Sequence, residues 1–248
     1  MTSAPPVMVL GCGRSGTSIF GELFDGLDRY NYQSEPAFEV VLTADYSMPQ
    51  AFKVPRESDL HPPGPGLSFP LDRFLEVAPR ARLFWIVRNP LDAVCSLRVG
   101  IAKQWGHHPR PPDWRDRLGE PLLAQCAHHW EFLNRAGYAQ VEHCATLVWF
   151  EDMIADPARF SARICEALAV DPAANAPHLA RWAKRVQNSN NKDFIEAQTS
   201  RSYSRPDHKV RVDRWRENLT DEEVTAIWDI VGETAQALGY RAPVRNRR

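Results

Sequence analysis

A guanidinium and several hydroxyl groups follow the first apolar run of the chain. Residues 7–10 lead directly into the sequence Gly11-Cys12-Gly13-Arg14-Ser15-Gly16-Thr17-Ser18. Glycines let backbone N–H groups turn toward a ligand, while the hydroxyls and the arginine add further donors. The pattern therefore predicts a loop that binds a phosphate-type anion between a strand and a helix. The alternative is a tight turn whose glycines only permit close packing.

The loop differs from a nucleotide-triphosphate loop at one decisive position. The spacing from Gly11 to Gly16 copies G-x-x-x-x-G-K-[ST], but Thr17 stands where the lysine is required. The cation of the loop is Arg14, upstream of that position. This arrangement suits a ligand with fewer charges than a β,γ-diphosphate and without a magnesium bridge. A mixed anhydride of phosphate and sulfate fits that description.

A second motif follows the apolar run at residues 83–87, where the chain continues Arg88-Asn89-Pro90-Leu91-Asp92 and reaches Ser96. An arginine at a strand end presents a planar fork that suits a phosphate, although alone it could be a surface arginine that caps a helix. Together, the two motifs resemble the bacterial type of the P-loop-like sulfotransferases that use 3′-phosphoadenosine 5′-phosphosulfate (PAPS).

The resemblance assigns roles to these residues. Arg88 and Ser96 correspond to the pair that binds the ribose 3′-phosphate. Arg14 takes the place of the catalytic cation. The residues implied to hold the 5′-phosphosulfate around it are Ser15, Gly16, Thr17 and Ser18.

A third match lies in the segment Phe150-Glu151-Asp152-Met153, which is similar to the Y-E-D-[ML] segment of the family. Phe150 replaces a tyrosine, so its ring could face the adenine but could offer no hydroxyl. An apolar strand that ends in Glu151 and Asp152 also resembles the magnesium-holding carboxylate of a nucleoside-triphosphatase. The missing loop lysine argues against that alternative.

A fourth match lies near the C-terminus, where a basic segment precedes Trp215. The resemblance implies that Lys209 and Arg214 are further phosphate ligands. The R-K-G tripeptide of the family is absent, and a solvated basic loop is the alternative.

The catalytic base differs from that of the family's cytosolic members. These carry K-T-H, whereas this chain has Lys53-Val54-Pro55. The K-x-P form resembles bacterial and protein-tyrosine sulfotransferases, which implies Glu35 as the base and a supporting role for Lys53. A loop glutamate and a surface lysine are the alternatives. His61 and His107 are reserve bases, in loops that could line an acceptor pocket.

Length and composition limit the class of protein. A chain of 248 residues that is 44% hydrophobic can bury a full core, and we expect one domain over residues 1–248 with flexible ends near 1–5 and 241–248. A net charge of −1 argues against nucleic acid as a partner. We expect no transmembrane segment and a cytoplasmic location, since apolar runs are short and the five cysteines form no paired metal spacing.

The periodicity predicts an α/β fold, a three-layer sandwich with a central parallel sheet. Strands are expected at 7–11, 51–55, 82–87 and 146–150, and helices at 17–28, 69–78, 90–104, 120–137, 157–169 and 220–238. Both phosphate motifs then lie at carboxyl ends of strands, where such sheets bind ligands. The stretches 61–70 and 105–119 are insertions that could shape an acceptor pocket.

These observations predict a sulfotransferase that moves a sulfuryl group from PAPS to a hydroxyl or amine, with no metal. The acceptor stays open among carbohydrate, lipid, small metabolite and peptide tyrosine, and the sequence gives no sign of the oligomeric state. Two alternatives remain, a P-loop nucleotide kinase or phosphotransferase and a non-catalytic nucleotide-binding protein.

Overall fold

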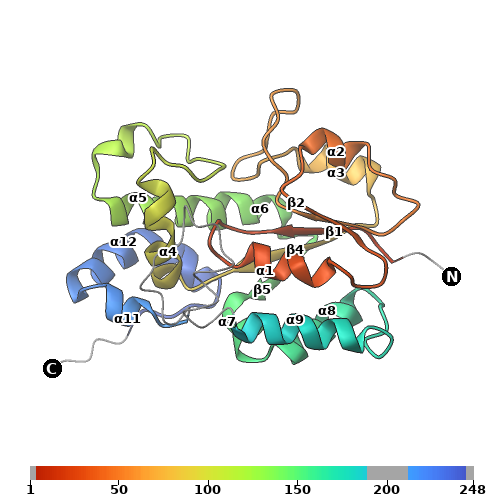
Figure 1. The fold of residues 1–248 in the computed structure, drawn as a ribbon. Coiled ribbons are helices and arrows are strands. Elements are labelled where there is room, and N and C mark those ends of the chain that lie inside the picture. The colour runs from red at the N-terminus through yellow and green to blue at the C-terminus, as the bar shows by residue number, and fades with distance from the viewer. Residues whose placement is uncertain (1–3, 189–211, 244–248) are drawn as a thin grey trace.

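A parallel five-stranded sheet in the order β2-β3-β1-β4-β5 forms the middle layer of the protein. The computed structural model describes residues 4–188 and 212–243 (Figure 1). The strands are β1 (Val7–Leu10), β2 (Asn31–Ser34), β3 (Gln50–Lys53), β4 (Arg82–Val87) and β5 (Ala145–Trp149).

Helices cover both faces of the sheet. The α-helices are α1 (Thr17–Gly21), α2 (Phe38–Leu42), α3 (Leu71–Val77), α4 (Pro90–Ile101), α5 (Leu122–Phe132), α6 (Tyr138–Val141), α7 (Phe150–Ala155), α8 (Pro157–Ala167), α9 (Ala176–Asn188), α11 (Trp215–Asn218) and α12 (Asp221–Ala237). Short 3₁₀ segments occur at η1 (Glu22–Phe24) and η2 (Asp116–Gly119), and a π-helical turn at η3 (Leu133–Gly137).

The alternation of side chains along each strand divides the apolar core in two. Val7 and Val9 of β1 face the core formed with α1, α8 and α9, while Met8 and Leu10 face the core formed with α2–α5 and α12. Successive side chains of a strand point to opposite faces, so a strand that is buried on both sides reads as a continuous apolar run. Figure 1 shows the same division, with α2 and α3 on one side of the sheet and α7, α8 and α9 on the other.

The structure confirms the predicted α/β sandwich and corrects several elements. The first helix was expected at 17–28, but α1 ends at Gly21 and continues only as a 3₁₀ turn. The helix expected at 120–137 gives way to a π-helical turn at Leu133. The sequence pattern did not predict β2, α2, α7, α9 or α11. The helix expected at 220–238 is α12, which begins with a reciprocal capping box between Thr220 and Glu223.

The topology creates a crevice at the carboxyl ends of the strands. The chain leaves β1 through α1 toward β2 at one edge, whereas it leaves β4 through α4 and α5 toward β5 at the other. The loops after the neighbouring strands β1 and β4 therefore lead in opposite directions. Open α/β sheets bind ligands at such a point. Within the described residues, no helix combines the length and apolar character needed to cross a membrane.

Candidate active site

The loop after β1 has a backbone that only glycine can adopt at two points. Gly11 has φ 145° and Gly16 has φ 96°. A Cβ at Gly16 would lie 2.4 Å from Cδ2 of Phe150, and one at Gly11 would lie 2.4 Å from the carbonyl oxygen of Ile86. The loop is thus pressed onto its neighbours, and both glycines are needed for that close approach.

Arg14 joins the loop after β1 to the segment after β4. Its Nε donates a hydrogen bond to Oγ of Ser96 at 3.0 Å, and its carbonyl oxygen accepts one from Nη1 of Arg88 at 3.0 Å. The arginine itself has φ 67°, an uncommon backbone conformation for a residue with a side chain. The structure therefore brings the two predicted phosphate motifs into direct contact.

A third guanidinium, that of Arg214, belongs to the same cluster. Arg88 and Arg214 are only 3% and 5% exposed. Burial lowers the pKa of Arg214 to about 10, and the positive charges of Arg88 and Arg14 act in the same direction. Like charges gathered in a buried place repel one another. An anion bound among them would relieve that repulsion.

Asp92 is the carboxylate that holds this cluster together. Its two oxygens accept hydrogen bonds from the backbone N–H groups of Asp213 (2.8 Å) and Trp215 (3.1 Å), which fixes the segment carrying Arg214 against α4. Burial raises the pKa of Asp92, while Arg88 opposes that shift. The sequence analysis assigned Asp92 no role, although an acidic residue in the first turn of a buried helix was a usable signal.

Ser15 and Thr17 are buried, and Ser18 is exposed. Oγ of Ser15 is buried and has no hydrogen-bond partner among the described residues. Buried hydroxyl groups normally have a partner. A buried hydroxyl in the loop that carries Arg14 is therefore suited to a phosphate group.

Phe150 lies beneath this cluster, at the start of α7. Its ring is 1% exposed, and the guanidinium of Arg88 lies 4.5 Å from the ring centroid. Both this contact and the contact with Gly16 make the ring a platform under the phosphate motifs. Contact between Phe150 and adenine stays a prediction.

The remaining predicted residues surround a cavity of about 560 Å³ next to the loop. Arg14, Thr17, Ser18, Glu35 and Lys53 all line it. Nζ of Lys53, a residue only 4% exposed, pairs with Oε1 of Glu35 and donates a hydrogen bond to Oγ of Ser18 at 3.3 Å. The proposed base and the proposed cation thus share one cavity.

The pairing of β2 with β3 explains why Glu35 meets Lys53. Ser34 and Lys53 are register partners, and the N–H of Glu35 donates to the carbonyl of Lys53 at 2.8 Å. Glu35 has φ 51°, so the chain turns sharply as it leaves the strand. Its side chain is 57% exposed and reaches the cavity from the sheet edge.

His107 also lines the cavity and is held as a neutral imidazole. Its ring centroid lies 5.8 Å from that of His129, and a Cβ at Gly100 would lie 2.2 Å from its Nε2. Burial lowers the pKa of His107 to about 4, with a smaller contribution from the charge of Arg14. A group with that pKa is a poor base near neutral pH.

We expect this buried imidazole to make stability depend on pH. The pKa of His107 in the folded protein lies below its ordinary value of 6.5, so its contribution to stability is present above pH 6.5 and decreases as the pH falls toward 4. Between about pH 7 and about pH 4.5, wild type should lose up to about 2.5 kcal/mol more unfolding free energy than His107→Gln. Urea titrations at both pH values measure this difference, and equal losses would contradict it.

The other predicted residues lie elsewhere. His61 packs edge-on against Phe38, with ring centroids 5.5 Å apart, and is not among the residues that line the cavity. Lys209 lies outside the described residues. Arg56, Glu57 and His108 line the cavity although the sequence analysis singled out none of them as a site residue.

Glu151, the carboxylate of the magnesium alternative, has a structural role. One oxygen accepts a hydrogen bond from the N–H of Asn89 at 2.8 Å, and the other accepts one from the hydroxyl of Tyr240 at 2.9 Å. Burial raises the pKa of this carboxyl group. Within the described ranges, no three His, Cys, Asp or Glu side chains gather as a metal site.

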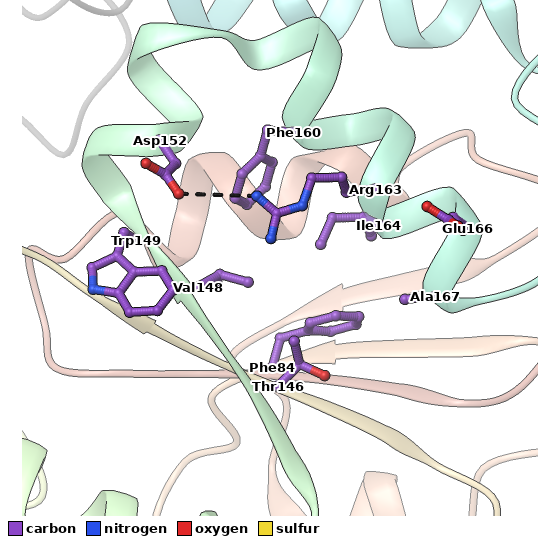
Figure 2. Close-up of a pocket in the computed structure, with 10 residues that line it drawn as sticks. All are labelled: Phe84, Thr146, Val148, Trp149, Asp152, Phe160, Arg163, Ile164, Glu166 and Ala167. Carbon is purple, nitrogen blue, oxygen red and sulfur yellow. Dashed lines mark ion pairs between the residues drawn. The ribbon is translucent and has the colours of Figure 1, made fainter. Parts of the chain in front are cut away.

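Figure 2 shows a second cavity, between β5 and α8, of about 250 Å³. Asp152 and Arg163 lie 4.0 Å apart on one side of it, and in Figure 2 the ring of Phe84 lies below this pair. None of the predicted site residues lines it. Asp152 therefore belongs to this cavity and not to the one around Arg14.

Solved structures with a similar fold are sulfotransferases and a retinol dehydratase. Mouse sulfotransferase SULT7A1 complexed with PAP is 13% identical, with a TM-score of 0.59 over 94% of this chain and 84% of that one. The sulfotransferase domain from the curacin biosynthetic pathway is 13% identical, with a TM-score of 0.57 over 98% and 100%. Retinol dehydratase in complex with retinol and PAP is 14% identical, with a TM-score of 0.53 over 98% and 84%.

At these identities the structural likeness shows the fold alone. No curated protein matches the sequence. The family model of the sulfotransferase family, however, matches residues 44–175, which is more than half of the chain. This range includes Lys53, the motif that begins at Arg88, and the segment at Phe150. The chain belongs to the sulfotransferase family.

Proposed function

We propose that this protein transfers a sulfuryl group from PAPS to a hydroxyl or amine of an acceptor. The observation that carries the proposal is the gathering of Arg14, Arg88 and Arg214 at the carboxyl ends of β1 and β4. Three guanidiniums in one partly buried place suit a ligand with two separate anionic groups. A nucleotide with phosphates on both its 3′ and 5′ positions has that charge pattern.

The proposed donor site divides between two sets of residues. Arg88, Ser96 and Arg214 would hold the 3′-phosphate, with Lys209 as a further proposed ligand. Arg14 and the loop residues Ser15, Gly16, Thr17 and Ser18 would hold the 5′ side. PAPS, when bound, supplies the sulfuryl group. The complexes of SULT7A1 and retinol dehydratase with PAP, adenosine 3′,5′-bisphosphate, support a donor of this type.

The proposed acceptor site is the cavity that Glu35 and Lys53 line. Glu35 would accept the proton of the acceptor hydroxyl, since its carboxylate reaches the cavity that Arg14 also lines. Lys53 would hold that carboxylate in place, because its Nζ contacts both Glu35 and Ser18. Arg14 would stabilise negative charge that develops as the sulfuryl group is transferred.

The kinase alternative has less support. Thr17 occupies the position of the phosphate-binding lysine, and the oxygens of Glu151 are engaged by Asn89 and Tyr240. A non-catalytic nucleotide-binding protein would have no chemical role for the Glu35–Lys53 pair at the cavity. Both alternatives are therefore outcomes that a binding experiment and a transfer assay must separate.

The test of the donor site is calorimetric titration with adenosine 3′,5′-bisphosphate. Adenosine 5′-phosphate and ATP with magnesium are the comparison ligands. We expect the bisphosphate to bind most tightly and without metal, because only it offers the 3′-phosphate to Arg88 and Arg214. Binding of ATP with magnesium alone would overturn the proposal. Binding of the bisphosphate without transfer of sulfate from PAPS to any acceptor would favour a non-catalytic protein.

A further inference from the structure

We infer that the acceptor is an elongated molecule with a nucleophilic end and an apolar body, and that the body lies in a groove between residues 63–67 and 108–114. The inference rests on the proposed function and names the class of acceptor. The groove has a volume of about 470 Å³ and lies beside the cavity around Arg14. It is built from the two insertions that follow β3 and α4.

The walls of the groove are mostly apolar. They include the side chain of Leu67, the ring of Phe132 and the indole of Trp114. The prolines that line it are Pro63, Pro65, Pro109, Pro111 and Pro112. Proline has no N–H to donate, so these walls offer few hydrogen-bond donors to a polar ligand. A carbohydrate, whose hydroxyls need many partners, fits this groove poorly.

The groove adjoins the cavity of the candidate active site. Glu57 and His108 line both of them, and Nδ1 of His108 lies 3.1 Å from Oε2 of Glu57. Both side chains are more than one third exposed, so this pair forms no buried wall between the cavity and the groove. A ligand whose reactive end lies near Arg14 can therefore extend past this pair into the groove.

Among the described lysine and arginine side chains, Arg110 alone lines the groove, and it is turned toward the protein. Nε of Arg110 donates to the carbonyl of Trp105 at 2.8 Å, and its guanidinium lies 4.3 Å from the ring centroid of Trp114. These contacts orient the charge toward a carbonyl and an indole. The groove thus lacks the character of an anion site, which separates it from the arginine cluster around Arg88.

The experiment measures how affinity depends on the length of the apolar body. Butanol, hexanol, octanol and decanol are titrated by calorimetry into protein saturated with adenosine 3′,5′-bisphosphate. Full burial of a methylene group strengthens binding by about 3- to 4-fold, so affinity should rise steadily along the series. A parallel titration with the disaccharide trehalose tests the carbohydrate alternative.

Two variants test whether the rise in affinity with chain length arises in the groove. Trp114→Ala removes the indole from the groove, and Pro112→Asp places a carboxylate at an exposed position of its wall. Each should lower the affinity for decanol by about 10-fold or more and leave that for butanol within about 2-fold. Trp228→Ala is the matched control, because Trp228 is also half-buried but lies on α12 outside the groove. If Trp114→Ala fails to fold, Pro112→Asp still decides the result.

The outcomes distinguish this inference from the proposed function. Failure of the bisphosphate to bind would refute the donor site itself. Bisphosphate binding with no rise in affinity from butanol to decanol, or tighter binding of trehalose, would overturn the apolar acceptor alone. A rise that Trp114→Ala and Pro112→Asp leave unchanged would place the apolar body elsewhere and would also overturn it.

Discussion

Replacing Arg14 with alanine should lower kcat for sulfuryl transfer by about 100- to 1000-fold, the usual effect of removing one group that stabilises developing charge. Arg14 lines the cavity with Glu35 and Lys53 and contacts Ser96, so it lies between the proposed donor and acceptor sites. Alanine adopts the positive φ of this position at no greater cost than arginine, so the substitution adds no backbone strain. Initial rates with saturating PAPS and a defined acceptor measure the effect.

Arg14→Lys is the matched control, because it keeps the charge and loses the planar fork. We expect it to retain more activity than Arg14→Ala but less than wild type. Thermal unfolding of both variants checks that the loop still folds. A kcat for Arg14→Ala within about 10-fold of wild type, in a folded protein, would remove Arg14 from the catalytic machinery.

Replacing Arg88 with alanine should weaken binding of adenosine 3′,5′-bisphosphate by about 1.5–3 kcal/mol, the cost of a lost charged hydrogen bond. This corresponds to about 10- to 150-fold in Kd. Arg88 is buried over Phe150 and donates to the carbonyl of Arg14, so it is held in place before any ligand arrives. Calorimetric titration of wild type and variant gives the difference.

Adenosine 5′-phosphate provides the control for Arg88→Ala, because it lacks the 3′-phosphate. We expect the variant to bind it about as well as wild type does. Equal weakening for both ligands would show that the substitution distorts the loop through the lost contact with Arg14. Unchanged affinity for the bisphosphate would refute the assignment of Arg88 to the 3′-phosphate.

The apolar strands and the two phosphate motifs were readable from the sequence for a physical reason. β1 and β4 are buried on both faces, so nearly every residue in them is apolar, and each ends abruptly in polar residues. β2 gave no such signal. Its sequence, Asn31-Tyr32-Gln33-Ser34, lies at the sheet edge and is exposed or half-buried, so only its pairing with β3 makes it a strand.

Because the sequence did not predict β2, it did not predict the contact between Glu35 and Lys53 either. Glu35 was selected by resemblance, and its distance from Lys53 followed only from the register of β2 with β3. The contact between Arg14 and Ser96 likewise joins residues 82 positions apart. Local patterns identify which side chains carry chemistry, whereas long-range pairing decides which of them meet.

The position of Asp92 has a consequence for how the protein matures during synthesis. Its carboxylate accepts hydrogen bonds from backbone N–H groups 121 and 123 residues further along the chain. A ribosome therefore makes the sheet and α4 long before it releases the segment that satisfies this acid and delivers Arg214. Until then the carboxylate at the start of α4 lacks these two backbone partners. Competence to hold the nucleotide thus arises late, after most of the sheet has been translated.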